Sequence, residues 1–71
     1  MKRTRLANLL RQIRLDAGLT QVQVASRLGE TQSYVSKYES GEQRLDLTEI
    51  ESVCKAVGVP LLKFVKAYLE G

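Results

Sequence analysis

The chain has 71 residues, of which 27% are charged and 44% hydrophobic, and its formal net charge is +3. These values fit one soluble domain with a small core, and no apolar run approaches the roughly 20 residues that a membrane span needs. With no histidine and one cysteine, Cys54, the sequence excludes an internal disulfide, an ordinary zinc site and Ser-His or Cys-His catalysis, so we expect no enzyme and no cofactor.

The first of five predicted helices runs from about Thr4 to Ala17. Its apolar side chains recur at helical spacing and form one stripe. The stripe consists of Leu6, Leu10, Ile13 and Ala17, with Leu9 beside it. Gly18 then ends the helix, because glycine tolerates the positive φ that follows a helix. Leu15 projects to the opposite side, where the core does not explain it.

The second and third predicted helices are short and follow each other closely. The second starts after Thr20 and the third after Thr31, and each threonine is a plausible N-cap. Gly29 supplies the turn between them and Gly41 ends the third. The residues expected to face inward are Val24, Ala25, Leu28, Val35, Tyr38 and Glu39. This unit over residues 20–40 predicts a helix-turn-helix, whose second helix can enter a DNA major groove.

The fourth predicted helix spans about Asp46 to Val57, where Asp46 and Glu49 fit a capping box. Its inward residues are predicted to be Leu47, Ile50, Val53, Cys54 and Val57. The fifth covers about 60–69, with Pro60 in its first turn. Its apolar residues span an arc of roughly 160°, against about 100° for one buried stripe. The excess predicts an apolar contact beyond the domain's own core.

Several residues at fixed spacing resemble the lambda-repressor-like (Cro/CI, XRE) helix-turn-helix domains. They are Arg14-Leu-Asp-Ala-Gly-Leu-Thr-Gln21, Val24-Ala25, Leu28-Gly29, Thr31-Gln32, Val35-Ser-Lys-Tyr-Glu-Ser-Gly41, and Leu47…Ile50…Ala56-Val57-Gly58-Val59. The resemblance covers residues 5–65. It implies an all-α fold, a compact five-helix bundle in one domain over residues 1–71, which binds operator DNA as a homodimer. Leu45 and Asp46 depart from the proline common in the loop before helix four, and Tyr38 replaces a more usual aliphatic residue.

The outer side of the third helix carries the predicted DNA contacts. Base readout is predicted for Gln32, Ser33, Ser36 and Lys37. A Gln32 amide matches adenine N6 and N7, and Lys37 could reach guanine or a phosphate. Phosphate contacts are predicted for Gln21, Thr31, Tyr34, Ser40, Gln43 and Arg44. The alternative for Gln32, Lys37 and Arg44 is a solvated surface, and for Tyr34 it is shielding of the turn.

The charge distribution also favours a polyanion partner at the N-terminal half. Residues 1–40 carry seven basic and three acidic groups, a charge of +4, whereas residues 41–71 carry four basic and five acidic groups, a charge of −1. A polyanion is therefore expected to be attracted more strongly to residues 1–40 than to residues 41–71. The basic start, residues 1–5, is either a DNA-touching arm or a frayed end.

The resemblance implies two further roles. Gln21 braces the first recognition residue, and Arg14 forms a partly buried ion pair with Glu39, which ties the first helix to the end of the third. The predicted homodimer interface on the fifth helix consists of Leu61, Leu62, Val65 and Leu69. Such a dimer sets two recognition helices about 34 Å apart, one turn of DNA, on a pseudo-palindromic site.

These observations predict a small cytoplasmic transcriptional regulator that binds double-stranded DNA sequence-specifically as a homodimer. No membrane, metal or small-molecule partner is expected. The alternative is a protein-interaction module or an antitoxin that keeps the fold with weak or no DNA binding of its own. Cys54 is expected to be a buried core residue rather than a redox sensor.

Overall fold

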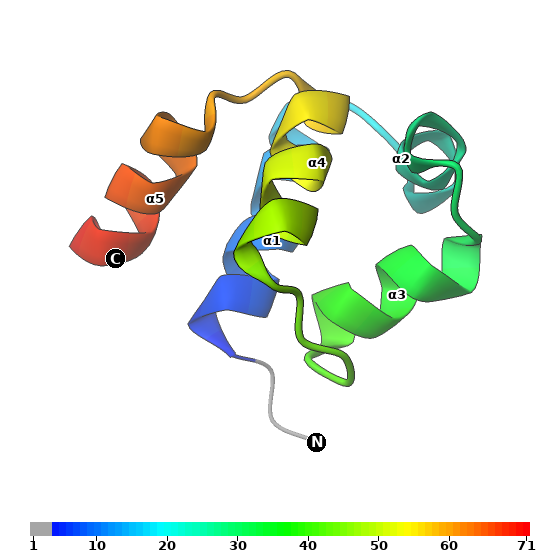
Figure 1. Cartoon of the computed structure of the whole chain (residues 1–71), viewed down its shortest axis with the longest axis horizontal. Helices are drawn as coiled ribbons and strands as arrows, with labels where there is room; N and C mark the ends of the chain where they lie inside the picture. The colour runs from blue at the N-terminus through cyan, green and yellow to red at the C-terminus, as the bar shows by residue number, and fades with distance from the viewer. Residues whose placement is uncertain (1–3) are drawn as a thin grey trace.

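The computed structural model describes residues 4–71 as five helices (Figure 1). They are α1 (Arg5–Asp16), α2 (Gln21–Leu28), α3 (Gln32–Ser40), α4 (Leu47–Val57) and α5 (Leu61–Glu70). The predicted all-α five-helix bundle is therefore confirmed. Within residues 4–71, no helix has both the length and the apolar character to cross a membrane. The first three residues of the predicted basic arm lie outside this range.

Side-chain caps set where the helices begin. The Thr20 hydroxyl accepts from the backbone N–H of Gln23 at 3.1 Å, and the Gln23 side chain accepts from the Thr20 N–H at 2.8 Å. Asp46 and Glu49 form the same reciprocal pair at 2.8 and 2.9 Å, as predicted. Each such cap is worth about 1 kcal/mol. Pro60 corrects a prediction, because its extended backbone makes it the N-cap of α5 rather than part of the first turn.

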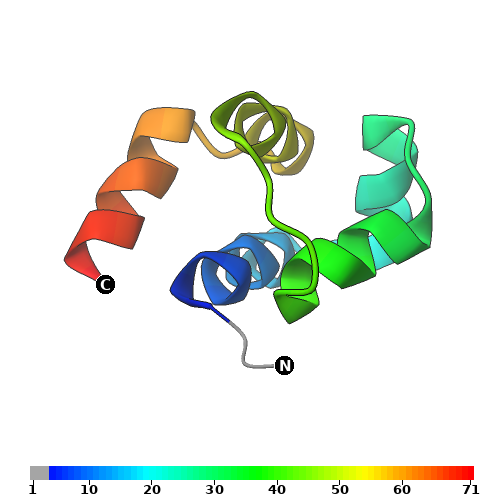
Figure 2. The same ribbon diagram turned by 60° about the horizontal axis from the view of Figure 1, so that its bottom comes forward.

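The core lies between α1, α2, α3 and α4, with α2 and α5 at opposite ends of the molecule (Figure 2). Its most deeply buried side chains come from the first four helices. They are Leu10, Val24, Val35, Tyr38, Glu39, Val53 and Cys54. Burying one such aliphatic side chain contributes about 1.5–3 kcal/mol. Among α5 residues only Phe64 is buried, whereas each of the other four helices buries at least two residues.

Two residues predicted to face the core lie on the surface. Leu47 is 66% exposed because it is the first residue of α4, before that helix passes over the core. Ala17 is exposed because α1 ends at Asp16 and the chain turns away at Gly18. Ala7 takes a core position that the predicted stripe did not include. Both errors fall at helix ends, where periodicity does not locate the neighbouring helix.

Tyr38 is 1% exposed, and its hydroxyl is the one buried side-chain polar atom without a hydrogen-bond partner among residues 4–71. Burial raises the pKa of this hydroxyl above its ordinary value. The Tyr38 ring packs edge-to-face against the Tyr34 ring, with 5.6 Å between the ring centroids. The hydroxyl therefore adds a desolvated polar group to a position that an aliphatic or phenyl side chain would fill.

We expect Tyr38→Phe to leave the free energy of unfolding unchanged or to raise it by about 1 kcal/mol, because an unpaired buried polar group costs about 1–3 kcal/mol. Urea unfolding followed by circular dichroism measures this change. Tyr34→Phe is the matched control, since the Tyr34 hydroxyl donates to Glu49 at 3.3 Å and its loss should destabilise. A loss of more than about 0.5 kcal/mol in Tyr38→Phe would mean that its hydroxyl has a partner in solution.

Candidate nucleic-acid interface

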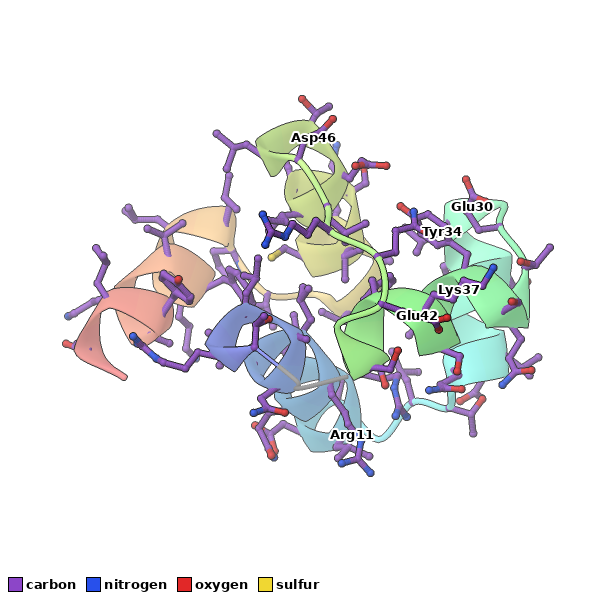
Figure 3. All side chains as sticks on the ribbon, turned by 90° about the horizontal axis from the view of Figure 1, so that it is seen from below. Arg11, Glu30, Tyr34, Lys37, Glu42 and Asp46 are labelled. Atoms are coloured by element: carbon purple, nitrogen blue, oxygen red, sulfur yellow. The ribbon has the colours of Figure 1, made fainter. Side chains whose placement is uncertain are left out.

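The helix-turn-helix unit presents one polar face of α3 to solvent. Gly29 ends α2 with φ at 70°, a left-handed conformation that glycine adopts without strain, so α3 can begin only three residues later. Val35, Tyr38 and Glu39 anchor its inner side. All four residues predicted to read bases are exposed, namely Gln32, Ser33, Ser36 and Lys37. Figure 3, seen from below, shows α3 in front with Lys37 and Glu42 labelled on and just after it.

Gln21 and Gln32 lie together across the turn between the two helices. The Nε2 of Gln32 donates to the Oε1 of Gln21 at 2.8 Å. The Nε2 of Gln21 in turn donates to the Oε1 of Glu39 at 3.1 Å. Gln21 thus links an exposed side chain at the start of α3 to a buried carboxylate near its end, and it restricts the position of Gln32 before any DNA is present.

The ion pair of Arg14 and Glu39 is bidentate and buried. The Nε of Arg14 donates to Oε2 of Glu39 at 2.7 Å and its Nη2 donates to Oε1 at 3.0 Å. The two residues are 8% and 2% exposed. The hydrogen bond to Glu39 raises the pKa of the Arg14 guanidinium. Its Nη1 also donates to the carbonyl of Leu19 at 2.9 Å, so one side chain joins α1, the α1–α2 connection and α3.

The residues predicted to contact phosphate occupy different surroundings. Tyr34 is half-buried, and its pKa rises to about 12 because of burial and the nearby Glu49 carboxylate. Its hydroxyl points to α4, which favours the alternative that Tyr34 shields the turn. Thr31 caps α3 by accepting from the Tyr34 N–H at 3.2 Å. The Ser40 hydroxyl donates to the carbonyl of Lys37 at 3.0 Å, within the end of α3.

Gln43 and Arg44 lie in the connection between α3 and α4, which bends back on the end of α3. The backbone N–H of Gln43 donates to the carbonyl of Lys37 at 3.2 Å, and that of Glu42 donates to the same oxygen at 3.0 Å. This geometry fixes the connection beside the last turn of α3. Arg44 is exposed there and Gln43 half-buried, so both are available at the C-terminal edge of the polar face.

The exposed apolar side of α5 forms a ridge of Leu62, Val65 and Leu69. Leu62 is 82% exposed and Leu69 is 76% exposed, while Val65 is half-buried. The predicted excess of apolar surface on this helix is therefore present. Leu61, also predicted in the interface, packs against the buried cluster instead.

Two further exposed residues were assigned to no site by the sequence interpretation. Leu47 is 66% exposed at the start of α4. Arg11 is exposed on α1, and Figure 3 shows it beside the connection to α2.

The helix-turn-helix family model HTH_3 matches residues 10–64. An XRE-family-like protein from Pseudomonas syringae pv. tomato str. DC3000 is 38% identical, with 92% of this chain and 79% of that chain covered and a TM-score of 0.85. The clp gene regulator ClgR from C. glutamicum is 26% identical, with 93% and 85% covered and a TM-score of 0.83. No curated protein sequence matches significantly.

Structures of the restriction-modification controller protein C.Esp1396I share the fold at 23% identity. The wild-type protein has a TM-score of 0.86, with 93% of this chain and 87% of that chain covered. A further structure of that protein is a tetramer in complex with its natural 35-base-pair operator. The five-helix arrangement described above is therefore shared with this controller protein, one structure of which holds its operator.

Proposed function

Because the chain belongs to the XRE-type helix-turn-helix family, it is a DNA-binding regulator, and we propose that it acts as a homodimer on a pseudo-palindromic operator. The observation that carries the proposal is the position of Gln32. It is exposed in the first turn of α3 and hydrogen-bonded to Gln21 at 2.8 Å. A recognition helix reads bases through this end, and an amide held in place loses less side-chain entropy on binding.

In this proposal α3 enters the major groove with its polar face toward the bases. Gln32 reads one base pair, Lys37 reaches a guanine or a phosphate one turn further on, and the two exposed serines Ser33 and Ser36 add contacts of low specificity. Gln21, Thr31 and the residues at the end of α3 hold the backbone. Those residues are Ser40, Gln43 and Arg44. Phosphate contacts fix register without reading sequence, and Tyr34 supports the turn.

The homodimer is proposed to form through the ridge on α5. Leu62 and Leu69 are exposed in the single chain. Burying each of them in a dimer would contribute roughly 1.5–3 kcal/mol of stabilisation. A two-fold interface uses the same patch on both chains. It would place two copies of α3 on one side of the DNA, at half-sites about one helical turn apart.

Selection of bound sequences from random DNA tests this function. We expect enriched sites with two inverted half-sites about 10 base pairs apart. Binding of such a site should also weaken steeply with salt, because each neutralised phosphate adds about 0.9 to the slope of log K against log salt. If no sequence is enriched and the salt response is flat, the chain is a protein-interaction module that keeps this fold without DNA binding.

A further inference from the structure

We infer that Arg5 sets the position of the C-terminal half of α5 and, through it, the half-site spacing that the proposed homodimer accepts. Arg5 is thus a positioning residue for operator choice and not a DNA contact. The sequence interpretation left the basic start, residues 1–5, as either a DNA-touching arm or a frayed end. The inference rests on the proposed function, because it concerns how two copies of α3 are held apart on one operator.

The core holds only the first part of α5. Phe64 is buried and Leu61 packs against the buried cluster, and both lie within the first four residues of the helix. From residue 65 to residue 70 no side chain is buried, and Leu69 is 76% exposed. Contacts outside the core must therefore decide where the last turns of α5 lie.

Arg5 makes such a contact from the first turn of α1. Its Nη2 donates to the backbone carbonyl of Tyr68, and its Cζ lies 4.9 Å from the centroid of the Tyr68 ring. This carbonyl is one of the last four of α5, which have no N–H partner within the helix. A cation is favoured there because the C-terminal end of a helix carries partial negative charge. One guanidinium therefore holds both the backbone and the side chain of Tyr68.

The ridge on α5 depends on this contact because Leu69 follows Tyr68 directly in the chain. Leu62 and Leu69 are seven residues apart, so the ridge runs about 10 Å along the helix. Without the contact at Tyr68, α5 can pivot about Phe64, and this movement displaces Leu69 relative to the rest of the bundle. The partner copy would then dock at a range of tilts instead of one.

A tilt of α5 changes the distance between the two copies of α3. Figure 1 shows α5 on one side of α1 and α4, with α3 on the other side, and Figure 2 shows the same order. The longest dimension of the molecule is 30 Å. Over that length a tilt of about 10° moves the far end by about 5 Å, which exceeds the rise of about 3.4 Å between successive base pairs. A fixed α5 therefore accepts one half-site spacing, whereas a loose α5 accepts several.

The same geometry argues against a phosphate contact by Arg5. Its guanidinium is engaged by both the carbonyl and the ring of Tyr68 on α5. That helix lies on the opposite side of α1 from α3, whose polar face is proposed to enter the groove (Figure 1). To reach DNA, Arg5 would have to give up both of its interactions with Tyr68.

The test compares a half-site duplex with operators whose half-sites stand at the selected spacing, or one base pair closer or further apart. Arg5→Met removes the guanidinium and keeps a long apolar side chain. We expect half-site affinity to stay within about twofold, while the preference for the selected spacing over the altered ones falls about tenfold. Amide hydrogen exchange in the last two turns of α5 should become about fivefold faster, because a cation–π contact and a hydrogen bond are lost.

Tyr68→Leu tests the other partner, since it removes the ring that the guanidinium covers and keeps an apolar side chain. The double variant Arg5→Met with Tyr68→Leu should lose little more spacing preference than Arg5→Met alone, because both changes remove one shared contact. Arg11→Met is the matched control. Arg11 is an exposed arginine on the same helix, and its loss should leave the spacing preference unchanged.

The outcomes separate this inference from the function on which it rests. An unaltered protein that selects no paired half-sites contradicts the proposed function, and the inference falls with it. A protein that selects them but keeps its spacing preference in Arg5→Met overturns the inference alone. Weaker half-site binding in Arg5→Met, with a salt slope lowered by about 0.9, also overturns it, because Arg5 is then a phosphate contact.

Discussion

Replacing Arg14 with alanine should lower the free energy of unfolding by about 3–5 kcal/mol, because it leaves a buried carboxylate without its cation. Glu39 is 2% exposed and receives both of its short bonds from this guanidinium. The carbonyl of Leu19 loses its donor in the same variant. A chain of 71 residues has a total stability of about 4–10 kcal/mol at 0.05–0.15 kcal/mol per residue, so much of this variant should be unfolded at room temperature.

Urea unfolding followed by circular dichroism measures the loss. Arg11→Ala is the matched control on the same helix, since Arg11 is exposed, and it should cost less than about 0.5 kcal/mol. The double variant Arg14→Met with Glu39→Met should recover most of the stability, because apolar residues of similar size often replace a buried pair without loss. A loss below about 0.5 kcal/mol in Arg14→Ala would show that the pair behaves as an exposed one.

Placing lysine at both Leu62 and Leu69 should convert the protein to a monomer and weaken operator binding by about 100- to 10,000-fold, because the second half-site is then no longer bound intramolecularly. Both side chains are more than three-quarters exposed in the single chain. Their replacement therefore removes apolar surface without disturbing the core. Sedimentation velocity gives the oligomeric state, and fluorescence anisotropy with labelled operator gives the affinity.

A half-site duplex provides the internal comparison for this variant. Affinity for one half-site should stay the same, since the polar face of α3 is untouched. Leu15→Lys is the control for adding charge at another exposed leucine on a different helix, and it should leave both measurements unchanged. If the unaltered protein stays monomeric at tens of micromolar with its operator present, the proposed interface on α5 is wrong.

The sequence predicts the helices well because their ends carry strong local signals. Thr20, Thr31 and Asp46 cap α2, α3 and α4 as expected, and Gly29 and Gly41 end α2 and α3 in the left-handed conformation. These interactions join residues at most four apart, so they can be read directly. The neighbouring helices decide which residues at a helix end meet the core. For that reason the prediction that Leu47 faces the core is wrong.

The sequence predicts which residues make up the candidate site, but it does not predict the hydrogen bonds between them. The spacing on α3 predicts which side chains are exposed, and the resemblance to known domains implies the pair of Arg14 and Glu39. The bond from Gln21 to Glu39 joins residues 18 positions apart on two helices. Its existence depends on how α2 crosses α3, to within an ångström. The unpaired hydroxyl of Tyr38 likewise arises from tertiary packing alone.

The weak attachment of α5 has a consequence for turnover in the cell. Phe64 is the one side chain of this helix that is buried, and Leu61 and the contact of Arg5 with the Tyr68 ring add to its attachment. An unpartnered copy therefore holds its C-terminal segment by few buried contacts. Segments with few buried contacts open most often, and proteolysis follows such opening. Association would cover the same segment. Surplus single copies would then be degraded faster than paired ones, which sharpens the response of operator occupancy to the rate of synthesis.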